Sequence, residues 1–341
     1  MARKTAHTRI GIREIAEKAG VSMMTASRAI RGVEGVSERK RAEILRIAKR
    51  LNYVPNSNAR SLSVENSNLV GISLPTFAND VFAGVLAGMR GTFEGAGYAS
   101  VIDTTEYNPE AENRWVDRLL TWRPAGVILT GTDHLPVVRQ KLRDAGIPTL
   151  EIWDVTDDPI DICVGINHWQ AGFAIGEHLV ELGYRKPAYV GTPIGRDARA
   201  DARLRGMEDA FSKLGGVVPV PRSERHEAHA FGAGFEGTKA LLAEGQPDTI
   251  FFLNDHMAFG GLMACGTLGL SVPEDIGLVG FNALDLTTVL PVPLTTASTP
   301  RRQIGIIGAR NLLARIHGVH PKRVEALKIT LISGATTRPQ G

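Results

Sequence analysis

The sequence lacks the features that mark secreted, membrane-spanning or disulfide-stapled proteins. It contains two cysteines, Cys163 and Cys265, which lie about 100 residues apart and match no zinc or redox spacing. We therefore expect two buried free thiols, with no metal or other cofactor. No run of about 18 uncharged apolar residues occurs, and the N-terminus carries Arg3, Lys4 and Arg9 where a signal peptide has its apolar core. These absences predict a cytoplasmic protein that makes no use of a membrane.

Catalytic signatures are missing as well. The chain has no Walker, GxSxG or HExxH segment, and its nine histidines are scattered. His226 and His229 stand three residues apart in an expected loop, which is weak support for a metal site. One acidic run is interrupted by Pro159, and this favours a solvated connection over a metal site. The run consists of Asp154, Asp157, Asp158 and Asp161. We expect a protein that is not an enzyme.

The charge of the chain is distributed unevenly. Residues 1–60 carry 14 Lys and Arg against 5 Asp and Glu, which leaves 25 against 31 for the rest of the chain. The first segment therefore has a net charge of +9 and the remainder −6, although the whole chain carries only +3. A basic head on an acidic body indicates that a polyanion binds at one end. The length of 341 residues predicts two or three domains.

The basic head has the pattern of three short helices. Apolar residues recur at helical spacing from Ile12, and Gly20-Val21 interrupts the pattern. Ser22 is a suitable N-cap for a second helix over 23–30, and a third helix is expected over 37–52, before Pro55. The second helix is the candidate for the major groove of double-stranded DNA. Its candidate contact residues are Met23, Met24, Thr25, Ser27 and Arg28.

The two methionines donate no hydrogen bond, so any base reading through them is apolar, for instance against thymine methyl groups. The alternative is that they fill gaps in the core of the head.

Residues 11–66 resemble the head of the LacI/GalR family of repressors. The segments AGVS, TASR, LNYVPN and ARSL stand at the spacing of that family. Gly11 departs from it, because relatives often have a Thr there that touches phosphate, so we assign no such contact. The resemblance implies a homodimer or higher oligomer on operator DNA, and a hinge helix that forms on the operator, with Leu62 wedged into the minor groove. It implies DNA contacts by Asn56, Ala59, Arg60 and Leu62. The alternative is an ordinary flexible linker.

The body has the rhythm of an α/β protein. From Leu69 onward, strand-like apolar runs alternate with helical patterns in two similar series, which predicts two lobes with parallel sheets. Ligands in such folds bind beyond the carboxyl ends of the strands, so the cleft between the lobes is the expected site. The family resemblance implies a periplasmic-binding-protein-like body with chain crossings near 165, 295 and 328. The expected domains are 10–56 for the head, 57–67 for the hinge and 68–341 for the core, with lobes at 68–165 plus 296–327 and 166–295 plus 328–341.

Candidate effector residues follow from the same resemblance, position by position. They are Asn79, Val81, Phe82, Trp153, Asp154, Arg199, Arg203, Asp255 and Asn282. Relatives that bind sugars or purines commonly have Asp at the place of Asn282, and the loss of that carboxylate beside arginines suits an anionic ligand. Arg199 and Arg203 have an alternative interpretation as a solvated helix face paired to Asp197 or Asp201.

The segments SMMTASRA and PTFANDVFA resemble gluconate-type and 2-ketogluconate-responsive regulators. The leading hypothesis is therefore a transcriptional repressor of sugar-acid catabolism controlled by a small-molecule effector, a sugar acid. The same architecture with a neutral sugar or nucleobase as effector is the runner-up. A solute-binding protein without DNA function is a further alternative.

Overall fold

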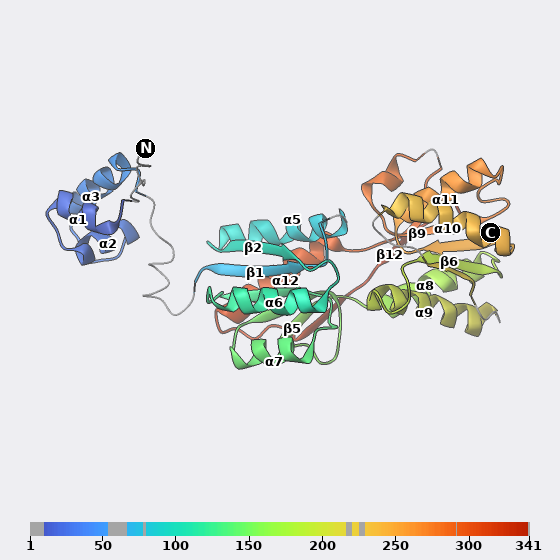
Figure 1. Cartoon of the computed structure of the whole chain (residues 1–341), viewed down its shortest axis with the longest axis horizontal. Coiled ribbons are helices and arrows are strands. Elements are labelled where there is room, and N and C mark those ends of the chain that lie inside the picture. Colours follow the sequence, from blue (N-terminus) through green and yellow to red (C-terminus); the bar gives the residue numbers. More distant parts are fainter. Residues whose placement is uncertain are drawn as a thin grey trace, which may run out of the picture. The chain divides into compact units, whose positions relative to one another are not determined.

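The computed structural model describes residues 10–53, 67–77, 80–215, 220–224, 229–290 and 292–339. The chain divides into two compact units, Met1–Ser67 and Asn68–Gly341 (Figure 1). Within the described residues, no helix has the length and apolar character needed to cross a membrane.

The first unit, which we call the head, contains three helices around one small core. They are α1 (Ile12–Ala19), α2 (Met23–Arg31) and α3 (Glu38–Arg50). Gly20 ends α1 with a φ of 62°, a left-handed conformation that costs glycine little. The Ser22 hydroxyl accepts a hydrogen bond from the Thr25 backbone N–H at 3.1 Å and so caps α2. The buried core side chains of the head are Ile15, Ala16, Ala19, Ala26, Ala29, Ile44, Ile47 and Ala48. Most of those on α1 and α2 are alanines, so these two helices can pack closely.

The second unit contains two six-stranded sheets, each forming one lobe. The first lobe's sheet is parallel throughout. Its spatial order is β11 (Val324–Leu327), β5 (Ile162–Ile166), β4 (Thr149–Asp154), β3 (Gly126–Thr130), β1 (Leu69–Leu74) and β2 (Ala99–Thr104). Its helices are α5 (Asp80–Gly95), α6 (Pro109–Leu120), α7 (Pro136–Asp144) and α12 (Arg301–Ile316).

The second lobe repeats this plan, except that its last strand runs antiparallel to its neighbour. Its spatial order is β12 (Thr330–Ile332), β10 (Thr295–Ser298), β9 (Gly277–Asn282), β8 (Thr249–Phe252), β6 (Pro187–Gly191) and β7 (Arg222–Glu224). Its helical elements are α8 (His168–Glu181), α9 (Ala198–Ala210), η1 (Phe211–Gly215), α10 (Ala230–Glu244), α11 (Asp255–Thr267) and η3 (Asp285–Thr288). The α/β fold class expected from the sequence is therefore correct.

The chain passes between the lobes three times. It leaves the first sheet after β5, returns after β10 to form α12 and β11, and ends in the second sheet with β12. Strand β10 pairs with β9 over Thr295–Ser298, so the second crossing follows Ser298, three residues after the expected position. Hydrogen bonding of these four residues to the second sheet is the reason for the later boundary.

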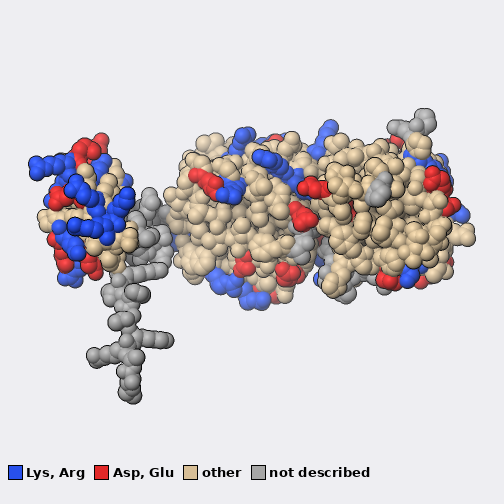
Figure 2. All heavy atoms as spheres, turned by 90° about the horizontal axis from the view of Figure 1, so that it is seen from above, with Lys and Arg blue, Asp and Glu red and all other residues tan. Residues whose placement is uncertain are grey.

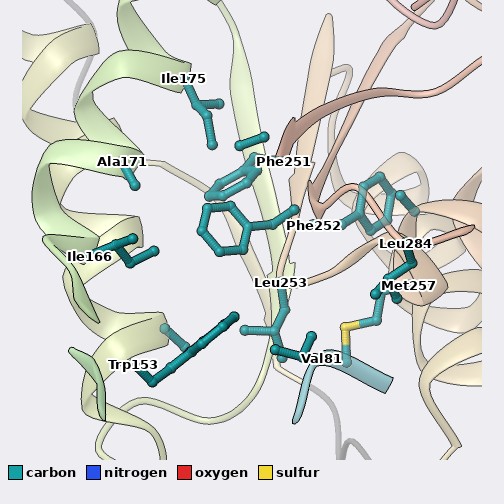
Figure 3. Close-up of a cluster of buried hydrophobic side chains, with 14 of the residues drawn as sticks. Val81, Trp153, Ile166, Ala171, Ile175, Phe251, Phe252, Leu253, Met257 and Leu284 are labelled. Carbon is teal, nitrogen blue, oxygen red and sulfur yellow. The ribbon is translucent and has the colours of Figure 1, made fainter. Parts of the chain in front are cut away.

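Burial explains why these segments form parallel strands. Strands β5, β8 and β9 are buried along their whole length, as strands covered by helices on both faces must be. Figure 3 shows part of the resulting apolar cluster. In this view Val81 lies beside Leu253 and Met257, and the ring of Trp153 is directed toward Leu253. Cys163 and Cys265 are buried and unbridged within this core.

Helices α8 and α9 cross at unusually close range because each contributes a glycine to the contact. A Cβ on Gly172 would overlap the carbonyl oxygen of Arg203, and one on Gly206 would overlap that of Trp169. The same reciprocal arrangement joins α10 to α11 and α5 to α12, through Gly234 with Gly260 and Gly88 with Gly305. In the first pair the contact also fixes the position of Arg203.

A methyl group at this contact has a predictable cost. Gly172→Ala should force α8 and α9 apart and lower the free energy of unfolding by roughly 1–3 kcal/mol or more. Gly91→Ala is the matched control, since Gly91 lies in α5 with nothing within 4 Å of its Cβ position. The control should be neutral or stabilising by up to about 1 kcal/mol. Urea denaturation measures both; equal effects would mean that the helix crossing tolerates a side chain.

Candidate effector cavity and nucleic-acid interface

A cavity lies where the carboxyl ends of strands from both sheets face each other. First-lobe residues come from α5, the turn after β2 and the end of β4, and second-lobe residues come from the start of α9, the turn after β8 and the end of β9. The lining residues are Val81, Phe82, Tyr107, Trp153, Asp197, Arg199, Arg203, Leu253, Asn254 and Asn282.

Six residues predicted to contact an effector therefore meet in one place: Val81, Phe82, Trp153, Arg199, Arg203 and Asn282. Asp154 lines an adjoining hollow, and Asn79 lies outside the described residues. Tyr107 and Leu253 also line the cavity and were not predicted from the sequence. Tyr107 lies just after β2, at the same edge of the sheet. This position after a strand end is the one sequence feature that could have predicted Tyr107 as a lining residue.

The two arginines are buried, and the interpretation of a solvated helix face is wrong. Arg199 is 9% exposed and Arg203 5%. Asp197 caps α9, and its Oδ1 accepts hydrogen bonds from the backbone N–H of Arg199 at 3.1 Å and from its Nε–H at 2.9 Å. Burial raises the pKa of Asp197, but the charges of Arg199 and Arg203 outweigh it and lower that pKa to about 2. Asp197 is therefore ionised at neutral pH.

One donor of this cluster is left over. The Nη1 atom of Arg199 is buried and has no hydrogen-bond partner among the described residues. A buried guanidinium N–H without an acceptor is costly, so the site favours an acceptor that comes from a ligand.

Several lining residues have left-handed backbone conformations. The φ angles are 57° at Tyr107, 79° at Trp153 and 104° at Asn282. Such conformations are strained for side chains with a Cβ and are often found at binding sites. Around Trp153 the chain turns so tightly that a Cβ on the neighbouring Gly165 would overlap the Asp154 backbone. Strain is thus concentrated where the cavity is built.

Asp255 differs from its predicted role in fixing ligand hydroxyls. It is fully buried behind the cavity, where its Oδ1 accepts from the Thr296 hydroxyl at 2.6 Å and its Oδ2 from the Leu284 backbone N–H at 2.7 Å. Burial raises its pKa to about 7, against the lowering effect of these two hydrogen bonds. The first residue of α11 points into the protein, so Asp255 fixes the loop after β9 that carries Asn282.

The neighbouring Asn254 faces the cavity instead. Its Oδ1 accepts from the Met257 backbone N–H at 3.0 Å and caps α11. Asn282 accepts from the Thr299 hydroxyl through Oδ1 at 3.4 Å. Both lining amides are therefore held in place by bonds to their oxygen atoms.

The adjoining hollow has an acidic lining and shares Tyr107, Asp197 and Arg199 with the cavity. Burial raises the pKa of Asp154, with the Val155 N–H bond and the charge of Arg199 acting against it. On its wall, His134 Nδ1 lies 2.7 Å from Glu112 Oε2. Burial lowers the pKa of His134, but the Glu112 bond and the nearby carboxylates outweigh this effect and raise it.

Two carboxylates of the acidic run that begins at the end of β4 form ion pairs. Asp158 pairs with Arg139, Arg143 and Arg323, and Asp161 pairs with Arg315. Within the described part of the chain, no three His, Cys, Asp or Glu side chains are grouped closely enough to hold a metal ion. His226 lies outside the described residues.

In the head, the start of α2 presents the predicted DNA-reading side chains to solvent. Met23 is 55% exposed and Met24 65%, so neither fills the core. Arg28 is also exposed, whereas Thr25 and Ser27 are half-buried. Lys and Arg side chains cover much of the visible face of the head (Figure 2). The predicted hinge contacts Asn56, Ala59, Arg60 and Leu62 lie outside the described residues.

Comparison with known proteins matches both units. Residues 11–56 match "Bacterial regulatory proteins, lacI family", and residues 177–337 match "Periplasmic binding protein-like domain". The HTH-type transcriptional regulator GntR of Escherichia coli (strain K12) is 34% identical over 328 residues, which are 95% of this chain and 98% of that protein.

Two solved structures extend the similarity to the fold. A LacI family transcriptional regulator from Silicibacter pomeroyi superimposes with a TM-score of 0.90 and 35% identity, covering 96% of this chain and 99% of the other. The lac repressor dimer bound to operator and the anti-inducer ONPF has a TM-score of 0.85 and 26% identity, covering 97% and 100%.

The buried Asp255 has a consequence for stability. Its folded-state pKa of about 7 lies above that of an unfolded Asp, so the folded protein holds a proton that the unfolded chain loses. The stability that this group provides is present in acid and is lost as pH rises from about 4 through about 7. Asp255→Asn should remove the trend, whereas Asp285→Asn, at an exposed site in η3, should keep it.

Urea unfolding at pH 5 and pH 8 measures the effect. Wild type should lose roughly 1–3 kcal/mol more than Asp255→Asn between these two pH values. Parallel pH profiles for wild type and Asp255→Asn would show that Asp255 is ionised throughout.

Proposed function

The chain belongs to the lacI family of bacterial regulatory proteins, and from this membership we propose that it represses genes of sugar-acid catabolism under the control of gluconate or 2-ketogluconate. The observation that carries the choice of effector is the Nη1 donor of buried Arg199, for which the described residues provide no acceptor, in a cavity that also contains Arg203. A carboxylate is the acceptor that matches a guanidinium best, through short charge-assisted hydrogen bonds.

The charge of the cavity limits the ligand further. Arg199 and Arg203 bring two positive charges, and ionised Asp197 brings one negative charge, so the three side chains together carry +1. A sugar acid with a single carboxylate neutralises that charge. A phosphorylated sugar acid adds negative charge in a desolvated site, which is unfavourable unless further cations pair with it.

The remaining lining suits the polyol chain of such a ligand. Asn254 and Asn282 offer amide groups to its hydroxyls, and Asp154 borders the adjoining hollow. Phe82 and Trp153, with ring centroids 5.8 Å apart, form an apolar wall against which C–H groups pack. The same aromatic pair would also suit a neutral sugar ring or a nucleobase, which is the second candidate effector class.

The DNA-binding part of the proposal concerns the head. A homodimer would place two copies of α2 in successive major grooves of a near-palindromic operator, as helix-turn-helix dimers do. Met23, Met24, Thr25, Ser27 and Arg28 are the proposed contacts of α2, and Asn56, Ala59, Arg60 and Leu62 those of the hinge. Effector occupancy would change operator affinity allosterically, through the two lobes and without contact with DNA. A cytoplasmic location, where DNA and sugar acids are both present, belongs to the same proposal.

Exposed apolar side chains of the head give a test of base reading. Met24→Ala should weaken operator binding by about tenfold, because it removes apolar contact with base edges while leaving phosphate contacts intact. Leu45→Ala is the control, since Leu45 is a similarly exposed apolar residue on α3. Gel shifts on the protein's own promoter and on random DNA measure both variants. Equal losses on both DNAs would contradict a reading role for Met24, and no promoter preference in wild type would refute the repressor proposal.

The effector assignment is tested by charge. Asn282→Asp should weaken gluconate binding by about tenfold or more, because the new side-chain carboxylate then repels the carboxylate of gluconate in a buried site. Glucose, which is neutral, should be affected less. Asn113→Asp is the control, because Asn113 does not line the cavity. Its Oδ1 accepts a hydrogen bond from Lys141 Nζ at 2.8 Å.

Isothermal titration calorimetry measures the affinity of the protein for gluconate, 2-ketogluconate, glucose and 6-phosphogluconate. Wild type should bind the two monocarboxylates at least about tenfold more tightly than the phosphorylated acid. Tight binding of glucose or a purine, with neither monocarboxylate bound, would overturn the sugar-acid assignment and leave the regulator assignment standing.

A further inference from the structure

A buried histidine joins the two lobes behind the effector cavity. His168 is the first residue of α8, directly after the chain leaves the first sheet, and it is 2% exposed. Its Nε2 lies 3.1 Å from the carbonyl oxygen of Trp153 at the end of β4, and its Nδ1 lies 3.0 Å from Nη1 of Arg203 on α9. One imidazole therefore connects a first-lobe strand end to a second-lobe arginine.

The chemistry of the two partners fixes the state of the ring. A guanidinium only donates hydrogen bonds, so Nδ1 must accept from Arg203. The carbonyl of Trp153 only accepts, so Nε2 must carry the proton and donate. A neutral imidazole in this tautomer satisfies both partners, and a doubly protonated ring would face Arg203 with a like charge. Burial, followed by the charges of Arg203 and Arg199, lowers the pKa of His168 well below its usual range.

Both ends of this connection line the cavity, whereas His168 itself does not. At one end, Trp153 has the strained φ of 79° and contacts Phe82 of α5. At the other end, the Arg203 guanidinium lies 4.4 Å from the ring centroid of Phe281 in β9. The imidazole ring is placed between Trp153 and Phe281, with centroids 6.3 Å from each. The ring is thus held by aromatic contacts from both lobes as well as by its two hydrogen bonds.

We propose that His168 is a positioning residue that transmits occupancy of the cavity from Arg203 in the second lobe to Trp153 in the first lobe; this rests on the proposed sugar-acid function. A carboxylate that binds Arg199 and also reaches Arg203, which lines the same cavity, competes for the donor that now serves His168. The imidazole then loses or weakens its bond to Arg203 and relaxes its hold on the Trp153 carbonyl. Since that carbonyl belongs to a strained turn, the position of the first-lobe wall depends on whether the cavity is filled.

The test compares two substitutions that differ in hydrogen-bonding pattern. His168→Gln keeps one donor and one acceptor, whereas His168→Leu keeps the bulk and removes both. His178→Leu is the matched control, because His178 lies on the same helix and does not line the cavity. The quantity measured is the coupling ratio, which is operator affinity without ligand divided by operator affinity with saturating gluconate.

Wild type and His178→Leu should both show a coupling ratio that differs from one by about tenfold or more, in either direction. His168→Leu should bring the ratio to within about threefold of one, while operator affinity without gluconate stays within about threefold of wild type. His168→Gln should restore part of the coupling. A purely structural role would instead lower the thermal stability of both His168 variants. The coupling ratio measured on the protein that remains folded would then be the same as in wild type.

Nitrogen NMR of the full-length protein gives an independent reading if His168→Leu folds poorly. At pH 7 the ring should be neutral, with its proton on Nε2; a proton on Nδ1 would overturn the proposal. Full coupling in folded His168→Leu would overturn the His168 proposal alone. If wild type shows no response to gluconate or 2-ketogluconate, the proposed function and the transmission role both fail. This outcome differs from failure of the His168 proposal alone, because the coupling ratio of wild type is then one.

Discussion

The buried ion pair of Arg199 with Asp197 is the interaction on which the candidate site depends. Two guanidinium groups at the start of α9 face one carboxylate, with almost no water to solvate any of them. Burying charge is costly unless each group finds a partner, and Asp197 satisfies only part of this requirement. Asp197 stays ionised because of its cationic neighbours, and one Arg199 donor has no acceptor in the part of the chain that the structure describes. The described side chains thus leave a hydrogen-bond donor open in a cavity between the lobes.

The surrounding fold holds this arrangement in place. The glycine contact between α8 and α9 brings the backbone at Arg203 close to α8, whose first residue is His168. Asp255 fixes the loop of Asn282 from behind, and the left-handed turn at Trp153 forms the opposite wall. Each of these devices uses buried polar groups or strained backbone, which stabilise the site only while the whole lobe structure persists. For this reason the cavity and the chain crossings beside it act as one unit.

The sequence predicted the architecture well because the relevant signals are local. Helical spacing from Ile12, the Ser22 cap and the alternating strands and helices after Leu69 correspond to observed elements. Six cavity residues were also expected in advance, because the resemblance to the LacI/GalR family carried them over position by position. The chain is a LacI-family DNA-binding regulator, as the pattern of its head indicated.

What the sequence did not reveal depends on the direction of side chains and on long-range packing. Asp255 and Asn254 are neighbours, and only the structure shows that the amide faces the cavity while the carboxylate points to Thr296. Charged residues at helical spacing look solvated in a sequence, so the burial of Arg199 and Arg203 was left open. His168 gave no signal at all, because its two partners are 15 and 35 residues away.

A crystal structure of the full-length protein with gluconate tests the central claim most directly. We expect the carboxylate of gluconate within hydrogen-bonding distance of Nη1 of Arg199, with its hydroxyls toward Asn254 and Asn282. A gluconate carboxylate directed to solvent or toward Asp154, with the Arg199 donor still unsatisfied, would contradict it.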